Sequence, residues 1–483
     1  MPRPRVLRLA WFDTAEGALG AQGRIIEISA VRQGTRQALR QVLPEDDQAW
    51  LPGAPGAVLA ETRLSRATPD AGAAGLAEGT PLVALATAEG RTRQLETALD
   101  GAPASLAIAD GTLRALAAEQ RFARVQITAP PDTLFAIALR LAGEVPLLPA
   151  LPLAEAARAL ALGQPARPPG RTPPAITRAM RVEESLVHVV LQLAGGLLWL
   201  VPTLGDRDSV EAVHQTRVTL RRLRSALAVW RAAIDSEALR GSGAGLRDMA
   251  RLLGPVRDRD VLLGGMLAAL ESDLAAEGTA TAPGLAEVRG ALASERAASH
   301  RALLAWTGSA AFRQLVLGLL AETLRRGWRA EADAKHLALL DAPVAGFAAH
   351  VLHRRSRKLL KRGDGLADAP IAALHAMRLS AKRLRYAGEF FAPLFPAKAA
   401  KRYLRRLAAL QEALGIVNDG AVAGSLVRAL PAAAGEAVGE AAVERAWAEG
   451  ALHGYAAARA TMARRDAAAA WRRFRKTAPF WTG

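Results

Sequence analysis

The residues of this chain that could bind an anion gather in two similar basic motifs. The motifs share the spacing of their basic residues, which are His214, Arg217, Arg221, Arg222 and Arg224 in the first copy and His375, Arg378, Lys382, Arg383 and Arg385 in the second. Each member of the first copy lies 161 positions before its counterpart. Arginine forks match phosphate oxygens in pairs, and lysine acts as a flexible point charge. The pattern therefore indicates anion binding by a duplicated helical module.

Helix geometry decides which of these side chains share a face. At about 100° per residue, His214, Arg217, Arg221 and Arg224 fall within a stripe about 80° wide that borders the apolar side of the helix. A charge run of this kind usually forms a solvated helix face. Here, however, the stripes contain few acidic residues at i+3 and i+4, and they recur in register in both copies. Because like charges repel unless an anion neutralises them, anion binding is the favoured interpretation.

Two further helical segments carry basic residues that could form opposing walls. One precedes the second motif and the other follows it, and their basic members are Arg354, Arg357, Lys358, Lys361 and Arg362, and Lys401, Arg402 and Arg405. Asp258 and Asp419 also recur at the 161-residue offset. Each of these two aspartates could either cap the next helix or pair with a motif arginine.

The two motif histidines do not have the surroundings of metal ligands. Neither His214 nor His375 has a carboxylate or a second His at i+4, and the chain contains no Cys. We therefore expect no metal site, no cofactor and no catalytic residue. Each His is instead expected to donate a hydrogen bond to the bound anion.

Charge divides the chain into two parts. The net charge is +17, yet residues 1–160 carry a net charge of −1 and the remainder carries +18. A positive field of this size recruits a polyanion. The apolar segment at 186–201 is short for a membrane span, and the chain does not begin with a signal-peptide pattern. We therefore expect a soluble, cytoplasmic protein without a membrane partner.

The first third of the chain is predicted to be an α+β domain. Short β-prone runs separated by Gly, Pro and Asp fill much of residues 1–162, with clear strands at 24–31 and 122–127. An amphipathic helix is predicted at 132–143. The many prolines of residues 163–175 indicate a stiff linker.

The rest of the chain is predicted to be helical. The duplication divides it into two helical repeats, at 176–335 and 336–475, and a C-terminal tail at 476–483. Gly and Pro residues predict helix breaks at several places, among them 241–245, 254–255 and 415–419. The expected architecture is two similar bundles of four or five helices each.

The two motifs closely resemble the CHAD family, the conserved-histidine α-helical domain. Each reads His-x-x-Arg-x-x-x-Arg/Lys-Arg-Leu-Arg, followed further on by Leu-Gly-x-Val-x-Asp, and the resemblance covers about residues 176–475. It implies an all-α domain of two pseudo-symmetric bundles with a basic central pore that binds inorganic polyphosphate. It also implies that the motif residues are basic positions of that pore, including Arg222 and Arg383, which lie outside the stripes.

Residues 1–162 more faintly resemble the CYTH family, the triphosphate-tunnel β-barrels that are often fused to CHAD domains. Catalysis in that family needs a Glu-x-Glu-x-Lys start and tunnel carboxylates that hold a divalent metal. Here the corresponding start reads Val-Leu-Arg-Leu-Ala at residues 6–10, and the first lysine of the whole chain is Lys335. The resemblance therefore implies a degenerate CYTH-like barrel, and we expect that the protein is not an enzyme.

The leading hypothesis is non-catalytic binding of inorganic polyphosphate in a basic pore between two helical bundles, with targeting to polyphosphate granules. One alternative is a basic helical protein that binds nucleic acid. The stripes lack the interleaved aromatic residues that stack on bases, which disfavours it. The other alternative is a residual metal-dependent triphosphatase, which the missing tunnel residues disfavour.

Overall fold

The chain forms two compact units, which are described separately. The first comprises Met1–Pro174, Val190–Trp199 and Ser309–Gly327, and the second comprises Ala175–Val189, Leu200–Gly308 and Trp328–Gly483. The computed structural model describes residues 2–31, 34–43, 53–54, 56–163, 175–206, 209–277, 283–363, 366, 369–430 and 439–482. Apart from its two end residues, the predicted linker at 163–175 lies outside the described residues.

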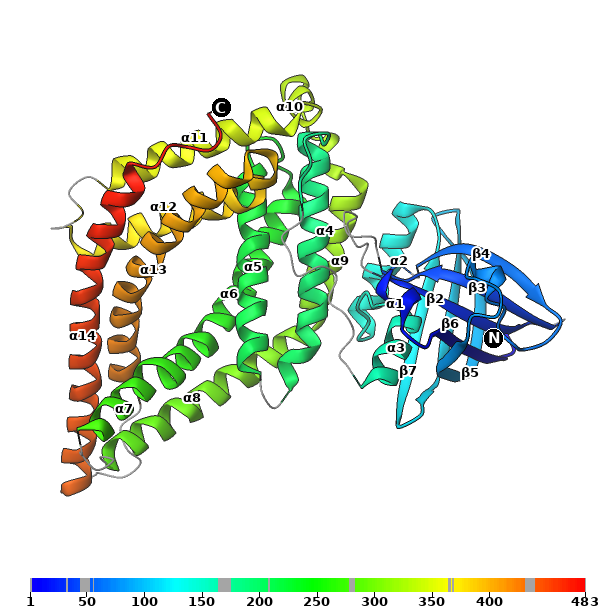
Figure 1. The fold of residues 1–483 in the computed structure, drawn as a ribbon, viewed down its shortest axis with the longest axis horizontal. Coiled ribbons are helices and arrows are strands. Elements are labelled where there is room, and N and C mark those ends of the chain that lie inside the picture. Colours follow the sequence, from blue (N-terminus) through cyan, green and yellow to red (C-terminus); the bar gives the residue numbers. More distant parts are fainter. Residues whose placement is uncertain are drawn as a thin grey trace. The chain divides into compact units, whose positions relative to one another are not determined.

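Seven antiparallel strands form a single sheet in the described part of the first unit (Figure 1). The strands pair in the order β4-β3-β2-β1-β5-β6-β7. Their bounds are β1 Arg5–Thr14, β2 Arg24–Val31, β3 Gly34–Gln41, β4 Ala57–Leu64, β5 Leu82–Leu99, β6 Ala102–Ala115 and β7 Ala118–Thr128. The predicted barrel is wrong, because among these strands the edges β4 and β7 do not pair and the sheet stays open.

Helix packing explains why this sheet does not need to close. Helix α3 (Leu153–Leu162) lies against β1, β5, β6 and β7. Trp11, Ile25 and Leu113 of the sheet belong to one buried core together with Ala157 of the helix. A helix thus buries the apolar face that opposing strands would bury in a barrel.

The local predictions for the first unit are confirmed. The strand predicted at 24–31 is β2, the one at 122–127 lies within β7, and the predicted helix is α2 (Pro131–Glu144). Helix α2 packs against α9 (Ala310–Arg325). One link between these two helices is a hydrogen bond of 2.8 Å, which Arg313 Nε donates to the carbonyl oxygen of Ala142.

Helices dominate the rest of the chain (Figure 1). Besides α1 (Ala18–Ala21) and those already named, their bounds are α4 Val182–Leu200, α5 Val210–Trp230, α6 Glu237–Val261, α7 Ala268–Ala276, α8 Pro283–Thr307, α10 Ala334–Leu340, α11 Val344–Arg362, α12 Ile371–Phe391, α13 Ala397–Arg428 and α14 Glu440–Arg475. A π-helical turn at Leu262–Leu267 joins α6 to α7. The segment Val182–Gly205 is long and apolar enough to cross a membrane, but 67% of its most apolar window is buried, as in a core helix.

The helices repeat at the same offset as the motif. Both ends of α5 lie 161 residues before the ends of α12. The offset also carries α4 onto α11 to within one residue at each end, and α6 onto α13 and α8 onto α14 to within seven residues at each end. Six helices contact one another in a closed series. Helix α5 contacts α6, α6 contacts α8, α8 contacts α14, α14 contacts α13, α13 contacts α12, and α12 contacts α5. The duplication predicted from the motif therefore extends over four pairs of helices.

Three predicted helix breaks are wrong. Residues 241–245 and 254–255 lie inside α6, and residues 415–419 lie inside α13. In α6 the residues Met249, Leu253 and Val256 continue one buried face past the Gly-Pro pair, while Pro255 itself is exposed. Burial of this continuous apolar stripe outweighs the cost of one missing backbone hydrogen bond.

An aromatic cluster holds the two motif helices together at their C-terminal ends. Trp230 of α5 lies 5.1 Å from Phe391 and 5.7 Å from Phe390 of α12, measured between ring centroids. Phe347 of α11 lies 6.3 Å from Trp230. Since Trp230 and Phe391 occupy equivalent positions of the two repeats, the duplicated helices meet through equivalent side chains.

Candidate anion-binding site

The basic stripes of the two motifs face each other where α5 packs against α12. Burial, together with the charges of Arg378, Arg221 and Arg217, lowers the pKa of the Lys382 ammonium to about 7. Lysine and arginine charges influence one another this strongly only at short range. We call Arg217, Arg221, Arg378 and Lys382 the central cluster.

The central cluster contains donors without a partner. Among the described residues, the buried Nε atoms of Arg221 and Arg378 have no hydrogen-bond acceptor. Burial lowers the pKa of both guanidinium groups, and each also feels the charge of Arg217. Buried donors of this kind are costly unless an acceptor reaches them. Oxyanion oxygens would supply such acceptors.

An aromatic ring supports one member of the cluster. The guanidinium carbon of Arg221 lies 5.3 Å from the ring centroid of Tyr386, which comes from the opposite motif helix. Tyr386 is only 5% exposed. Burial raises the pKa of its hydroxyl, so this side chain stays neutral. The contact is a cation–π interaction that orients the Arg221 side chain across the helix boundary.

The two repeated aspartates pair with motif arginines. Asp258 Oδ1 lies 3.7 Å from Arg217 Nη2, and Asp419 Oδ1 lies 3.9 Å from Arg378 Nη2. Because α6 and α13 continue through these positions, neither aspartate caps a helix. Burial raises the pKa of Asp258, and Arg217 opposes that shift. The alternative left open by the sequence is thus decided in favour of ion pairing.

The two motif histidines have different surroundings. Burial lowers the pKa of His214, and the charge of Arg257 on α6 lowers it further. His375 is exposed, and its Nδ1 donates a hydrogen bond of 3.0 Å to Asn418 Oδ1. Asn418 occupies the position equivalent to Arg257. His214 therefore has a cationic neighbour at this position, and His375 has a neutral one.

One acidic residue neutralises the outer end of the cluster. Glu389 accepts a hydrogen bond of 2.7 Å from Arg385 Nε, and its other oxygen lies 3.6 Å from Arg222 Nη2. Glu389 is an acidic partner that the sequence prediction did not include, although it lies four residues after Arg385 on the same helix face. Arg222 and Arg385 are therefore partly satisfied without an added anion.

Helix α6 extends the basic surface on the side of the first motif. Arg224 is exposed, and burial of its remaining part lowers its pKa together with the charges of Arg247, Arg217 and Arg251. Arg247 and Arg251 were not predicted as site residues. Their i, i+4 spacing on one helix face was the signal that could have identified them.

Helix α11 contributes through two arginines with structural contacts. Arg355 donates to the carbonyl oxygens of Arg383 on α12, at 2.6 Å, and of Ala228 on α5, at 3.2 Å. Arg362 donates to the carbonyl oxygen of Ala376 at 2.9 Å, which ties α11 to α12. The predicted site residues included Arg362 but not Arg355. The contacts make Arg355 the residue that bridges both motif helices.

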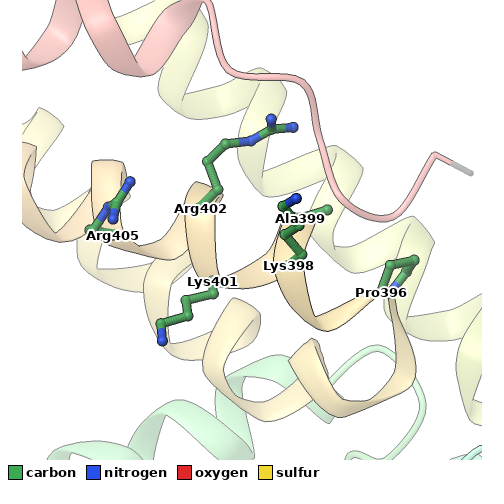
Figure 2. Close-up of a pocket in the computed structure, with 6 residues that line it drawn as sticks. All are labelled: Pro396, Lys398, Ala399, Lys401, Arg402 and Arg405. Carbon is green, nitrogen blue, oxygen red and sulfur yellow. The ribbon is translucent and has the colours of Figure 1, made fainter.

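The remaining predicted residues lie outside the central cluster. Those of α11 are exposed on the face opposite its buried side chains, and they are Arg354, Arg357, Lys358 and Lys361. Those of α13 line an open hollow of about 460 Å³ near the start of the helix, and they are Lys401, Arg402 and Arg405 (Figure 2). The charges that shift the pKa values of Arg378 and Lys382 come from other residues.

In the part of the chain that the structure describes, no group of three His, Cys, Asp or Glu side chains converges as metal ligands would. The equivalents of the tunnel residues lie in β1 and β7, where Arg124 is half-buried and donates to the carbonyl oxygen of Leu151.

The comparisons with known proteins concern the helical region. Residues 197–428 match the family model described as "CHAD domain", so this part of the chain is a CHAD domain. The crystal structure of the CHAD domain from the plant Ricinus communis is similar, with 27% sequence identity and a TM-score of 0.50 over 62% of this chain and 94% of that chain. The match to the family model includes every helix from α5 to α13, and the seven-stranded sheet lies outside it.

A second solved structure, PptA from Streptomyces chartreusis, shares 19% sequence identity, with a TM-score of 0.45 over 61% of this chain and 100% of that chain. No curated protein matches the chain.

Proposed function

We propose that this protein binds inorganic polyphosphate at the central cluster without catalysing a reaction. The observation that carries the proposal is the meeting of two basic stripes from equivalent helices, in which Arg221 and Arg378 keep buried Nε donors without an acceptor. Association of CHAD domains with polyphosphate supports the choice of ligand. A pore between two bundles is the geometry that this family resemblance implies.

The chemistry of the cluster favours a phosphate chain over a nucleic acid. Phosphate oxygens accept paired hydrogen bonds from arginine forks. Binding of single-stranded nucleic acid usually adds aromatic side chains on which bases stack. Here Tyr386 is buried beneath Arg221, and Phe390 and Phe391 belong to the core. These three rings are therefore closed to a base.

The non-catalytic part of the proposal rests on the residues themselves. The central cluster consists of cations whose two carboxylate neighbours, Asp258 and Asp419, are already paired with arginines. A triphosphatase of the tunnel type would need carboxylates free to hold a divalent metal. We further propose that the protein acts in the cytoplasm at polyphosphate granules.

A competition titration tests the ligand. Labelled long-chain polyphosphate is displaced by unlabelled polyphosphate, duplex DNA or single-stranded RNA of matched charge, at several salt concentrations and with or without magnesium. We expect affinity to fall steeply with salt and nucleic acid to compete poorly. Equal displacement by nucleic acid would contradict the polyphosphate assignment, and phosphate release would contradict the absence of catalysis.

Charge reversal tests the location. The double variant Arg217→Glu/Arg378→Glu should lose most of the affinity for polyphosphate. The matched control is Arg301→Glu/Arg465→Glu, which makes the same charge change at two exposed positions on α8 and α14. Similar losses in the two variants would mean that a diffuse surface field, and not the central cluster, binds the chain.

A further inference from the structure

We propose that Lys398, Lys401, Arg402 and Arg405 form a second contact surface for the same polyphosphate chain, separate from the central cluster. We call these four residues the α13 basic face. The inference rests on the proposed function, because it assigns another stretch of that ligand to a surface outside the duplicated motif. All four residues line the hollow at the start of α13 (Figure 2).

The four side chains share one face of a well-anchored helix. Their spacing of i, i+3, i+4 and i+7 puts them on one stripe, and all four are exposed. The opposite face carries Tyr403, which is 2% exposed and lies 5.1 Å from Phe474 and from Trp481 between ring centroids. The Tyr403 hydroxyl also hydrogen-bonds Ser356 of α11 at 3.3 Å. The basic face therefore projects from a fixed base.

The α13 basic face lacks the acidic partners that lie beside two exposed arginines of α6. Arg240 pairs with Asp235 at 3.1 Å, and Arg251 pairs with Asp248 on the same turn of α6. Within the described residues, by contrast, no ion pair involves any member of the α13 basic face. Four unscreened like charges around one hollow repel one another, and an anion that enters the hollow removes this repulsion.

The duplication does not account for this face. The equivalent positions of the first repeat are occupied by Glu237, Arg240, Gly241 and Ala244, which include one acidic residue and only one basic residue. The positive charge at the start of α13 is therefore a feature of the second repeat alone. It is independent of the paired motifs, whose basic positions recur in both repeats.

Helix α11 supplies a matched control. Four of its exposed basic residues have the same i, i+3, i+4 and i+7 spacing, and they are Arg354, Arg357, Lys358 and Lys361. The two faces thus carry equal charge on equally exposed helices, whereas the hollow is formed by the α13 face. A ligand that fits the hollow would bind the α13 face in preference to the α11 face. A ligand attracted only by net charge would bind both faces equally.

A second contact predicts a dependence on chain length. A chain that fills the central cluster and is long enough to reach α13 binds the second surface as a tethered ligand. Such tethering raises overall affinity by roughly 10²–10⁴ without any change in either contact. The charges of the α13 basic face are not among those that shift the pKa values of Arg378 and Lys382. We therefore expect tripolyphosphate, with only three phosphates, to bind the central cluster without gaining from the α13 basic face.

The chain's few lysines make the test direct. It contains only seven, of which Lys382 lies in the central cluster, two in the α13 basic face and two in the α11 control face. Full-length protein is treated with an amine-reactive reagent, with and without polyphosphate, and modification is measured at each lysine by mass spectrometry. We expect tripolyphosphate to protect Lys382 alone. Long-chain polyphosphate should protect Lys382, Lys398 and Lys401, and leave Lys358 and Lys361 reactive.

Each outcome separates the inference from the proposed function. Protection of Lys382 by long chains, with Lys398 and Lys401 as reactive as the α11 lysines, would overturn the second contact and leave the first intact. Equal protection on α11 and α13 would also overturn it, in favour of a diffuse field. If Lys382 stays reactive in every condition, the proposed function itself fails. If duplex DNA or an acidic peptide protected Lys398 and Lys401 as well as long-chain polyphosphate does, the assignment to polyphosphate would be overturned.

Variants give a second readout. Changing the four residues of the α13 basic face to Gln should lower affinity for long chains about tenfold or more and leave tripolyphosphate binding unchanged. The same change on the α11 control face should have a much smaller effect. Equal losses in the two variants would contradict the proposal.

Discussion

The two repeats place their motif residues at equivalent positions, on α5 and α6 in the first and on α12 and α13 in the second. The residues that surround the two motifs differ. The first repeat has basic residues on α6 where the second has neutral or acidic residues on α13, and the equivalent pairs are Arg247 and Ala408, Arg251 and Glu412, and Arg257 and Asn418. Duplication therefore determines the positions of the basic motif residues. Substitutions at neighbouring positions determine which charges surround each of them.

The comparison also separates the roles of the two helices that meet. Arg221 of the first motif corresponds to Lys382 of the second. At this position the first motif therefore carries a permanent positive charge, and the second carries one that titrates near pH 7. Tyr386, which orients Arg221, corresponds to Ser225. Within the central cluster, the second repeat thus supplies the titratable group, and the first supplies two of the three permanently charged arginines.

The largest expected effect concerns the core that the repeats share. Trp230→Ala and Phe391→Ala, which truncate equivalent and fully buried side chains, should each lower the free energy of unfolding by about 3–5 kcal/mol. Denaturant unfolding measures both values. A large loss for one variant with almost none for the other would show that only one repeat depends on this contact.

A smaller effect is expected where the repeats differ in their support. Arg355→Gln removes the hydrogen bonds to the carbonyl oxygens of Ala228 and Arg383 and has no counterpart in the first repeat, where the equivalent residue is Ala194. The loss of these bonds should cost about 1–3 kcal/mol of stability and weaken polyphosphate binding. Unchanged affinity in a folded Arg355→Gln variant would show that Arg355 does not position the two motif helices for binding.

The next prediction concerns pH. The pKa of Lys382 is about 7 in the free protein, and a bound polyanion returns it toward the ordinary value of 10.5. Binding between these two pH values takes up a proton, so affinity should fall by up to about tenfold per pH unit as pH rises above 7. Lys382→Arg, which copies the first repeat, should remove this dependence. A dependence that persists in Lys382→Arg would assign the titration to another group.

The smallest effect is expected at the outer end of the cluster. Glu389→Gln frees Arg222 and Arg385 from their carboxylate partner, whose equivalent in the first repeat is Ala228. Affinity for polyphosphate should rise by only a few-fold, because these ion pairs are partly exposed to solvent and solvent-screened pairs contribute about 0–1 kcal/mol. The salt dependence of binding should also become steeper. Weaker binding by this variant would mean that Glu389 holds the two arginines in place for the ligand.

Much of the site could be predicted from helix periodicity. The wheel of the first motif predicted Val213, Leu220 and Leu223 on the buried side, and each is at most 1% exposed. The same construction selected the four residues of the central cluster. These predictions succeeded because a helix fixes the angular positions of its side chains, whatever it packs against.

The predictions that failed depended on tertiary packing. Breaks were expected at Gly254 and Gly415, yet a continuous apolar face on each helix outweighs a local preference to end it. The barrel expected for the first domain required edge strands to pair, whereas helix α3 covers the sheet instead. The roles of Arg355 and Glu389 depend on which helices meet, which residue spacing on one helix does not reveal.

The central claim is that the two stripes form a single binding site. The most direct measurement is calorimetric titration of tripolyphosphate into the wild-type protein, Arg217→Gln, Arg378→Gln and the double variant. We predict one high-affinity site per chain, weakened by each single change, with losses that are not additive in the double variant because the two residues share one ligand. Two sites per chain, each abolished by one change and unaffected by the other, would contradict this account.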